Sequence, residues 1–276
     1  MKNIAIKRGI NMRTFVPTLF FLSCLLQVNL ASAKGALSPS TGVINSPGNG
    51  SLEVVIYEIS NAKATVVMLP GGTWNIGKIS EDSGRLSGKN FFIRTIPMFL
   101  EQGFNVVTMS KPKEAGDLGD SVIRAGKPHA EDVLAMAGRA HLLGKPVWLL
   151  GTSMGGISAV NAATADTKAL IAGVVISSPV AKKNPRIQAS ALDFPLEQIK
   201  VPVYVSGHEK DGCSSTPPSS TREVASRLVA SKKVVLKMTQ GGSDPNGSPC
   251  GPTHWHGYIN AEAEVVKQMS DFIKSN

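Results

Sequence analysis

One five-residue segment, Gly151-Thr152-Ser153-Met154-Gly155, constrains the fold more than any other part of the chain. It stands directly after a short apolar run, residues 146–150, and directly before a helical pattern over residues 157–165. Large side chains at 151 and 155 would collide with the neighbouring strand and helix, which explains both glycines. We therefore expect Ser153 in a strained strand-to-helix turn, exposed above a sheet and beside the positive end of the following helix.

The rest of the chain supplies the sheet that such a turn requires. From residue 51, strand-like and helix-like segments alternate, which predicts an α/β domain over 51–276, with a mostly parallel sheet and helices on both faces. The expected strands are 52–57, 64–69, 104–109, 146–150, 170–176, 201–205 and 234–238. The expected helices are 91–102, 129–143, 157–165, 220–230 and one from about residue 261. Residues 111–128 are expected to be a surface loop, and the short late connections leave no room for a large lid domain.

The N-terminus predicts an export signal over residues 1–33. A basic start without acidic residues precedes an apolar run, and the run closes on Ala31-Ser32-Ala33, a pattern accepted by signal peptidase. A membrane anchor and a lipid attached to Cys24 are weaker interpretations, since the run is short for a bilayer span and its flank matches a lipobox poorly. We expect a periplasmic or secreted protein, with a flexible lead-in over residues 34–50.

The charge of the chain limits its possible partners, and its cysteine content indicates the compartment. The chain has 29 basic and 20 acidic residues, and four of the basic ones lie in 1–33, so the formal net charge falls from +9 to +5 after cleavage. The remaining lysine pairs are scattered, which argues against a nucleic-acid partner. The two cysteines left, Cys213 and Cys250, are an even count that suits one disulfide in an oxidising compartment.

Four features together resemble the α/β-hydrolase family, particularly its small dienelactone-hydrolase-like and esterase members. They are Pro70-Gly71-Gly72, the segment 151–155, an acidic residue after a late strand, and a His-Gly pair near the C-terminus, in the family's order of serine, acid and histidine. The resemblance covers about 51–276. It implies a serine hydrolase that forms an acyl-enzyme on a small ester-like substrate, without a cofactor.

The same resemblance assigns the acid and the base. Asp211 matches the acid loop, because Gly212 follows it, while Glu209 remains a rival. His256, followed by Gly257, matches the base, and His254 is the alternative two residues away. An acid in this position would orient the histidine and stabilise its charged form.

The oxyanion hole is expected from two backbone amides. One belongs to Met154, the residue after the serine, and the other to the loop after the strand ending at Leu69. Thr73 is favoured in that loop and Gly72 is the alternative, since the loop departs from the His-Gly-Gly-Gly form of some esterases.

Further residues lie near these segments. Gly72, Trp74, His254 and Trp255 are candidates to line the pocket, although core packing explains the two tryptophans equally well. A disulfide between Cys213 and Cys250 would tie the acid loop to the base loop. Metal binding by these cysteines with His254 and His256 is the competing interpretation, and it leaves the serine turn unexplained.

Several alternatives to ester hydrolysis stay open at this point. Peptidase, thioesterase and lactonase chemistry use the same residues, and a non-catalytic exported binding protein could keep the fold. Natural substrate and oligomeric state are left open.

Overall fold

The computed structural model describes residues 37–115 and 120–276. The predicted signal peptide over residues 1–33, including Cys24, lies outside the described residues. In the part that is described, no helix combines the length and the apolar character needed to cross a bilayer.

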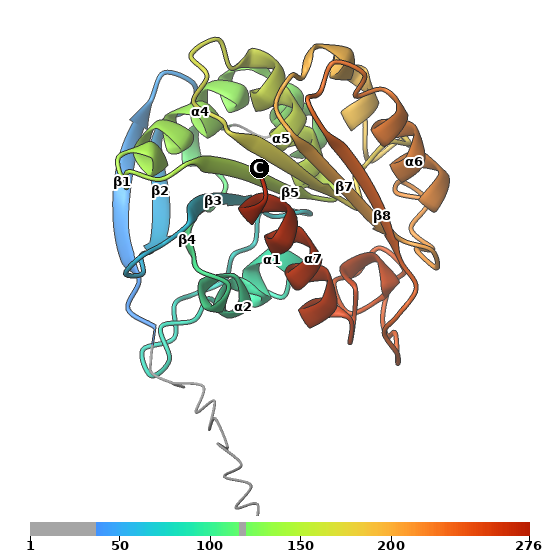
Figure 1. Cartoon of the computed structure of the whole chain (residues 1–276), viewed down its shortest axis with the longest axis horizontal. Helices are drawn as coiled ribbons and strands as arrows, with labels where there is room; N and C mark the ends of the chain where they lie inside the picture. The colour runs from blue at the N-terminus through green and yellow to red at the C-terminus, as the bar shows by residue number, and fades with distance from the viewer. Residues whose placement is uncertain (1–36, 116–119) are drawn as a thin grey trace, which may run out of the picture. The chain divides into compact units, whose positions relative to one another are not determined.

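The described residues form an eight-stranded sheet (Figure 1). Its strands are β1 (Ser40–Ser46), β2 (Gly50–Tyr57), β3 (Ala64–Leu69), β4 (Phe104–Met109), β5 (Val147–Thr152), β6 (Gly173–Ser177), β7 (Val203–His208) and β8 (Val234–Thr239). Their spatial order is β1-β2-β4-β3-β5-β6-β7-β8. The pairs β1–β2 and β2–β4 are antiparallel, and every later pair is parallel. The carboxyl ends of β5, β6 and β7 therefore meet at one edge of the sheet.

Helices cover both faces of this sheet. They are α1 (Phe91–Arg94), α2 (Ile96–Glu101), α3 (Asp120–Ala125), α4 (Lys127–His141), α5 (Met154–Ala165), α6 (Pro218–Ser226) and α7 (Glu262–Lys274). Short 3-10 turns lie at η1 (Lys113–Ala115), η2 (Ala191–Asp193), η3 (Leu196–Gln198) and η4 (Trp255–Gly257). Figure 1 shows α4, α5 and α6 on one face and α1, α2 and α7 on the other. The predicted α/β class with helices on both faces is confirmed.

Two apolar layers hold the helices to the sheet. β3 is buried along its whole length and contributes to both layers, because successive side chains of a strand point to opposite faces. Val67 and Leu69 pack in the layer under α4 and α5, while Val66 and Met68 pack in the layer under α2 and α7. A continuous apolar run was the expected pattern for a strand buried on both sides.

The N-terminal edge differs from the expected flexible lead-in. Residues 40–46 form β1, which pairs antiparallel with β2 through a tight turn, so the domain begins before residue 51. Asp132, wholly buried on α4, anchors this hairpin by accepting hydrogen bonds from Ser46 Oγ (2.7 Å) and from the Asn49 amide (2.8 Å). The Gly, Ser and Pro content of the segment belongs to an exposed edge strand and its turn.

Two further expectations need correction. The helix expected over residues 91–102 is broken at Thr95, because Pro97 has no N–H to donate to the carbonyl of Ile93. The surface loop expected over residues 111–128 contains α3 and the start of α4. The polar composition of this segment predicts exposed side chains, whereas Arg124 is fully buried.

Candidate active site

Ser153 occupies the turn between β5 and α5 with φ 55° and ψ −121°. A positive φ is unfavourable for a residue with a side chain and costs about 1–3 kcal/mol. Neighbouring backbone holds the turn: the Ser153 amide donates to the Ser177 carbonyl (2.9 Å), and the Gly156 amide donates to the Ser153 carbonyl (3.0 Å). The strained strand-to-helix turn expected from the sequence is therefore present.

The glycines around Ser153 allow β3, β5 and α5 to approach each other closely. A Cβ atom at residue 151 would lie 2.2 Å from the Gly155 carbonyl oxygen. A Cβ atom at residue 155 would lie 1.9 Å from the carbonyl oxygen of Leu69. At Gly156 the nearest atom would be Pro179 Cβ at 3.4 Å, which is close to an ordinary contact.

The acid and base candidates are in direct contact. Asp211 lies in the loop after β7 and His256 in η4, and Asp211 Oδ2 lies 2.9 Å from His256 Nδ1. Both side chains are buried. Asp211 also accepts hydrogen bonds from the Thr216 hydroxyl (2.9 Å) and the Cys213 amide (2.9 Å). Since Nδ1 is engaged with the carboxylate, Nε2 is the other ring nitrogen of His256, and His256 and Ser153 line the same cavity.

The rival residues lie in other environments. Glu209 pairs with Arg222 at 2.5 Å on the surface. His254 packs edge-on against Trp255, with ring centroids 6.3 Å apart, and its buried Nδ1 has no hydrogen-bond partner among the described residues. Only His256, of these two histidines, contacts Asp211 in the described structure.

Tyr258 ties the His256 loop to the edge of the sheet. Its buried hydroxyl accepts hydrogen bonds from Ser177 Oγ (3.0 Å) and Ser178 Oγ (3.2 Å) and lies 3.1 Å from Ser206 Oγ. The single Ser178 hydroxyl proton is shared with the His256 carbonyl, which also lies 3.2 Å from Ser178 Oγ. Burial raises the pKa of Tyr258, so the hydroxyl stays neutral. The ends of β6 and β7 thereby fix the backbone that carries His256.

A disulfide joins Cys213 and Cys250, which are 37 positions apart in the sequence. It connects the Asp211 loop to the segment that precedes His256. Closing a loop of this length stabilises the fold by about 4 kcal/mol in the chain-entropy model. Both sulfurs are consumed in the bond, so neither can be a thiolate metal ligand while the bond is intact. Residues 37–115 and 120–276 hold no group of three or more His, Cys, Asp or Glu side chains suited to a metal.

The loop after β3 lies directly against Ser153. A Cβ atom at Gly71 would be 2.8 Å from Ser153 Cβ, so only glycine fits there. Gly72 (φ 58°) and Trp74 (φ 55°) both have left-handed backbone, which turns the amides of this loop sharply. Thr73 lies between them, and Met154 is the first residue of α5, where helix N–H groups have no partner inside the helix.

Arg124 of α3 binds the carbonyls of this loop, and no sequence pattern pointed to this role. The side chain is fully buried, and Nη2 donates to the carbonyls of Pro70 (2.8 Å) and Gly72 (3.2 Å). Its guanidinium also stacks 3.6 Å from the centroid of the Trp74 ring. Burial lowers the pKa of Arg124 to about 9, against the opposing charge of Asp120, so the group remains charged at neutral pH.

Behind Arg124 lies a second group of serine, histidine and aspartate. Ser158 Oγ accepts a hydrogen bond from Arg124 Nη1 (2.9 Å) and lies 2.8 Å from His129 Nε2. His129 Nδ1 is 3.9 Å from Asp132 Oδ2. Ser158, His129 and Asp132 are wholly buried, so this group cannot reach a substrate and serves as internal support for Arg124.

A cavity of about 380 Å³ brings the candidate residues together. Ser153, His256, Gly72 and Thr73 all line it. Trp74, His254 and Trp255, which were candidates for the pocket, are not among its lining residues. Trp74 is core, 1% exposed, and Trp255 stacks on His208 with ring centroids 4.8 Å apart. Trp74 cannot reach the cavity because it is buried in the core. Core packing was the alternative to a pocket role that the sequence left open for both tryptophans.

The two neighbouring glycines give a matched test of the turn. We expect Gly155→Ala to lower the free energy of unfolding by about 3 kcal/mol or more, because its Cβ would overlap the Leu69 carbonyl. Gly156→Ala should stay within about 1 kcal/mol of the parent protein, since Pro179 leaves room for a methyl group. Urea unfolding followed by circular dichroism measures both, and equal losses would contradict the close approach at residue 155.

His129 makes a prediction about pH. Burial, and then the charge of Arg124, lower its pKa from 6.5 to about 3. The unfolded chain takes up this proton as pH falls below about 6.5, whereas the folded protein does not, so the free energy of unfolding must fall between pH 6.5 and 3. The slope from this one group approaches about 1.4 kcal/mol per pH unit.

Urea unfolding at pH 7, 6 and 5 checks this expectation. His129→Gln should remove that part of the slope, while His141→Gln, on the exposed end of the same helix, should keep it. If both variants kept the parent slope, His129 would not be a buried neutral histidine.

Comparisons with known proteins support the architecture. Residues 123–241, less than half of the chain, match the family model described as serine aminopeptidase, S33. The matched range includes Ser153 and Asp211 and stops before His256. A search of curated proteins finds no match.

Solved structures share the fold at low sequence identity. An esterase from Pyrococcus furiosus has 16% identity and a TM-score of 0.62, over 87% of this chain and 91% of that one. A cold-adapted esterase from an Arctic intertidal metagenomic library has 12% identity and a TM-score of 0.57, over 86% and 95%. A serine hydrolase without a lid from Xanthomonas campestris has 13% identity and a TM-score of 0.54, over 86% and 94%. These likenesses confirm the expected resemblance, and the chain has the α/β-hydrolase fold.

Proposed function

We propose that this protein is a serine hydrolase that cleaves carboxylic esters through an acyl-enzyme. The observation that carries the proposal is the 2.9 Å contact between Asp211 Oδ2 and His256 Nδ1, beside a cavity that Ser153 and His256 both line. The serine, histidine and acid come in the chain order of the family. Relatives in fold that are named esterases support an ester as the substrate class.

The proposed reaction begins with proton transfer from Ser153 Oγ to His256 Nε2. The serine oxygen attacks the carbonyl carbon of the ester, and the negative charge that develops on the carbonyl oxygen is received by the amides of Thr73 and Met154. Asp211 stabilises the positive imidazolium. His256 then gives its proton to the departing alkoxide, and a water molecule, activated by the same histidine, hydrolyses the acyl-enzyme.

Amide cleavage is the second candidate. The family model is described as a serine aminopeptidase, and an acylaminoacyl peptidase from Pyrococcus horikoshii shares the fold with a TM-score of 0.62. This chain covers only 42% of that peptidase. Parallel assays with an ester and an amide of the same acyl group decide between the two substrates.

We also propose that the protein is exported to the periplasm or secreted. The Cys213–Cys250 disulfide supports this location, since such bonds persist in oxidising compartments. The signal-like pattern over residues 1–33 supports it independently. N-terminal sequencing of protein recovered from the periplasm or medium should begin after Ala33.

The nucleophile and base can be tested by active-site labelling. We expect a fluorophosphonate to modify Ser153, as mapped by peptide mass spectrometry, and Ser153→Ala to lower hydrolysis of a short chromogenic ester by about 1000-fold or more. Labelling should disappear in His256→Ala and persist in His254→Ala, because only His256 contacts Asp211. A folded, disulfide-bonded protein that neither labels nor hydrolyses the ester would point to a non-catalytic binding protein.

Arg124 is proposed as a positioning residue for the loop that carries Thr73. Arg124 reaches Ser158 through Nη1 and the carbonyls of Pro70 and Gly72 through Nη2, whereas lysine carries all its donors on a single nitrogen. Arg124→Lys should therefore lower kcat by about 10- to 100-fold with a much smaller change in KM. The matched control is Arg227→Lys, since Arg227 also donates to two carbonyls, those of Leu192 (2.7 Å) and Phe194 (3.2 Å). Equal effects on kcat in the two variants would contradict this role.

A further inference from the structure

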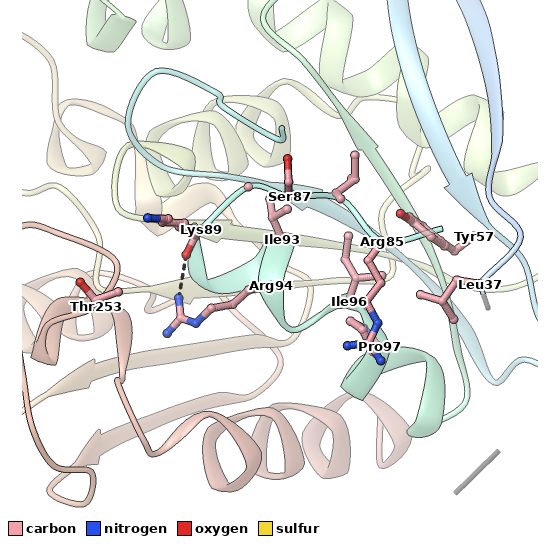
Figure 2. A pocket seen from close by; sticks show the side chains of 12 residues that line it. Leu37, Tyr57, Arg85, Ser87, Lys89, Ile93, Arg94, Ile96, Pro97 and Thr253 are labelled. Carbon is pink, nitrogen blue, oxygen red and sulfur yellow. Dashed lines mark hydrogen bonds between the residues drawn. The ribbon is translucent and has the colours of Figure 1, made fainter. Parts of the chain in front are cut away.

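A second cavity, of about 250 Å³, adjoins the one that holds Ser153 (Figure 2). The two cavities share a wall, since Ser87, Gly88 and Lys89 line both of them. The two cavities are therefore direct neighbours. Nothing in the proposed mechanism uses the second one.

The interior of the second cavity is apolar. Leu37, Ile93, Ile96 and Pro97 line it, together with the ring of Tyr57. The Tyr57 hydroxyl donates to the Gly84 carbonyl at 2.9 Å, so it is already engaged. Such a surface suits a hydrocarbon chain or ring.

Positive charge surrounds this apolar interior. Three of the lining residues are basic, namely Arg85, Lys89 and Arg94, and none is acidic. The charge of Arg94 is already paired, because its guanidinium lies 2.8 Å from Glu262. Arg94 also donates a hydrogen bond to the Lys89 carbonyl at 3.0 Å, which is the dashed line in Figure 2.

Arg85 and Lys89 differ from Arg94. Both are exposed, and the described part of the chain shows no ion pair for either side chain. Their charges are therefore uncompensated at the opening of an apolar cavity, where an anion would be favourable.

The shared wall is fixed by backbone hydrogen bonds. The Gly88 amide donates to the Ile76 carbonyl (3.0 Å), and the Ser87 amide donates to the Lys78 carbonyl (3.0 Å). A Cβ atom at residue 88 would lie 2.7 Å from the Ile76 carbonyl oxygen, so glycine is required and the wall carries no side chain there. Gly88 therefore lets the wall pack closely on the backbone of Ile76, and this packing keeps the two cavities next to each other.

We propose that the second cavity recognises the remote end of the substrate, and that this end is an apolar chain terminating in a carboxylate. This inference rests on the proposed ester hydrolysis at Ser153. The scissile carbonyl lies at Ser153, the chain extends past the shared wall into the second cavity, and the carboxylate meets Arg85. Figure 2 shows Lys89 on the other side of the cavity, so Lys89 adds its positive charge from the shared wall. A plain hydrocarbon chain would leave both charges unused.

The test compares two p-nitrophenyl esters of the same chain length. One is the monoester of a dicarboxylic acid, and the other has its free carboxylate capped as a methyl ester. We expect kcat/KM to favour the free acid by about threefold to tenfold, as two exposed charge pairs would give. Added salt at 0.5 M should reduce this ratio, because it screens exposed charges.

A double variant separates the cavity from the overall positive charge of the protein. Arg85→Gln/Lys89→Gln should bring the ratio of kcat/KM for the two esters to about one. The control is Lys168→Gln/Lys232→Gln, which removes the same charge from the loops before β6 and β8, at the opposite edge of the sheet from Ser153. This control should keep the parent ratio.

Three results would overturn the inference. A parent ratio of one or less excludes recognition of the carboxylate, and an equal fall of the ratio in both double variants assigns the preference to general electrostatic attraction. In either case hydrolysis of the capped ester leaves the proposed function standing. If the parent protein hydrolyses neither ester and does not label at Ser153, the proposed function fails and this inference fails with it.

Discussion

The close approach of β3, β5 and α5 around Ser153 is the constraint on which the rest of the site depends. A positive φ at a serine is unfavourable by itself, and it persists because the surrounding backbone leaves no alternative path. The Leu69 carbonyl oxygen lies 1.9 Å from the place that a Cβ atom of residue 155 would occupy. Ser153 Cβ lies 2.8 Å from the place that a Cβ atom of residue 71 would occupy. Strand pairing, helix packing and the loop after β3 are therefore adjusted to one another. A change in any of them must move the serine.

Buried contacts hold the loops that carry Asp211, His256 and Gly72 in place around Ser153. Tyr258 and three serines fix the His256 backbone to the ends of β6 and β7, and the disulfide connects the loop that carries Asp211 to the segment before His256. On the other side, Arg124 binds the carbonyls of the loop at Gly72. Groups buried in this way lose strong interactions if displaced, so they hold a single geometry. The site is thus supported from both sides of Ser153 by residues of which only Cys250 lines the cavity that contains Ser153.

Prediction from the sequence succeeded where local pattern and burial agree. Apolar runs such as residues 64–69 predicted the central strands, because a strand covered on both faces must be apolar throughout. Prediction failed where contacts with residues distant in the sequence determine the local structure. Residues 40–46 are polar and become a strand only by pairing with β2 and by contact of their turn with Asp132. Arg124 gave no signal, since a lone arginine in a polar stretch is normally exposed.

The fold class, the serine turn and the three segments proposed to supply an acid, a base and an oxyanion hole can all be recognised in the amino-acid sequence alone. Spacing and glycine placement encode these features, because they are properties of the local backbone. Which of these side chains come into contact follows from the folded chain. It brought His256 rather than His254 to Asp211 and took Trp74 into the core. It also placed an apolar cavity with basic residues among its lining next to the cavity that Ser153 lines. Side-chain contacts between loops depend on how distant strands are ordered in the sheet, and no short stretch of sequence contains that information.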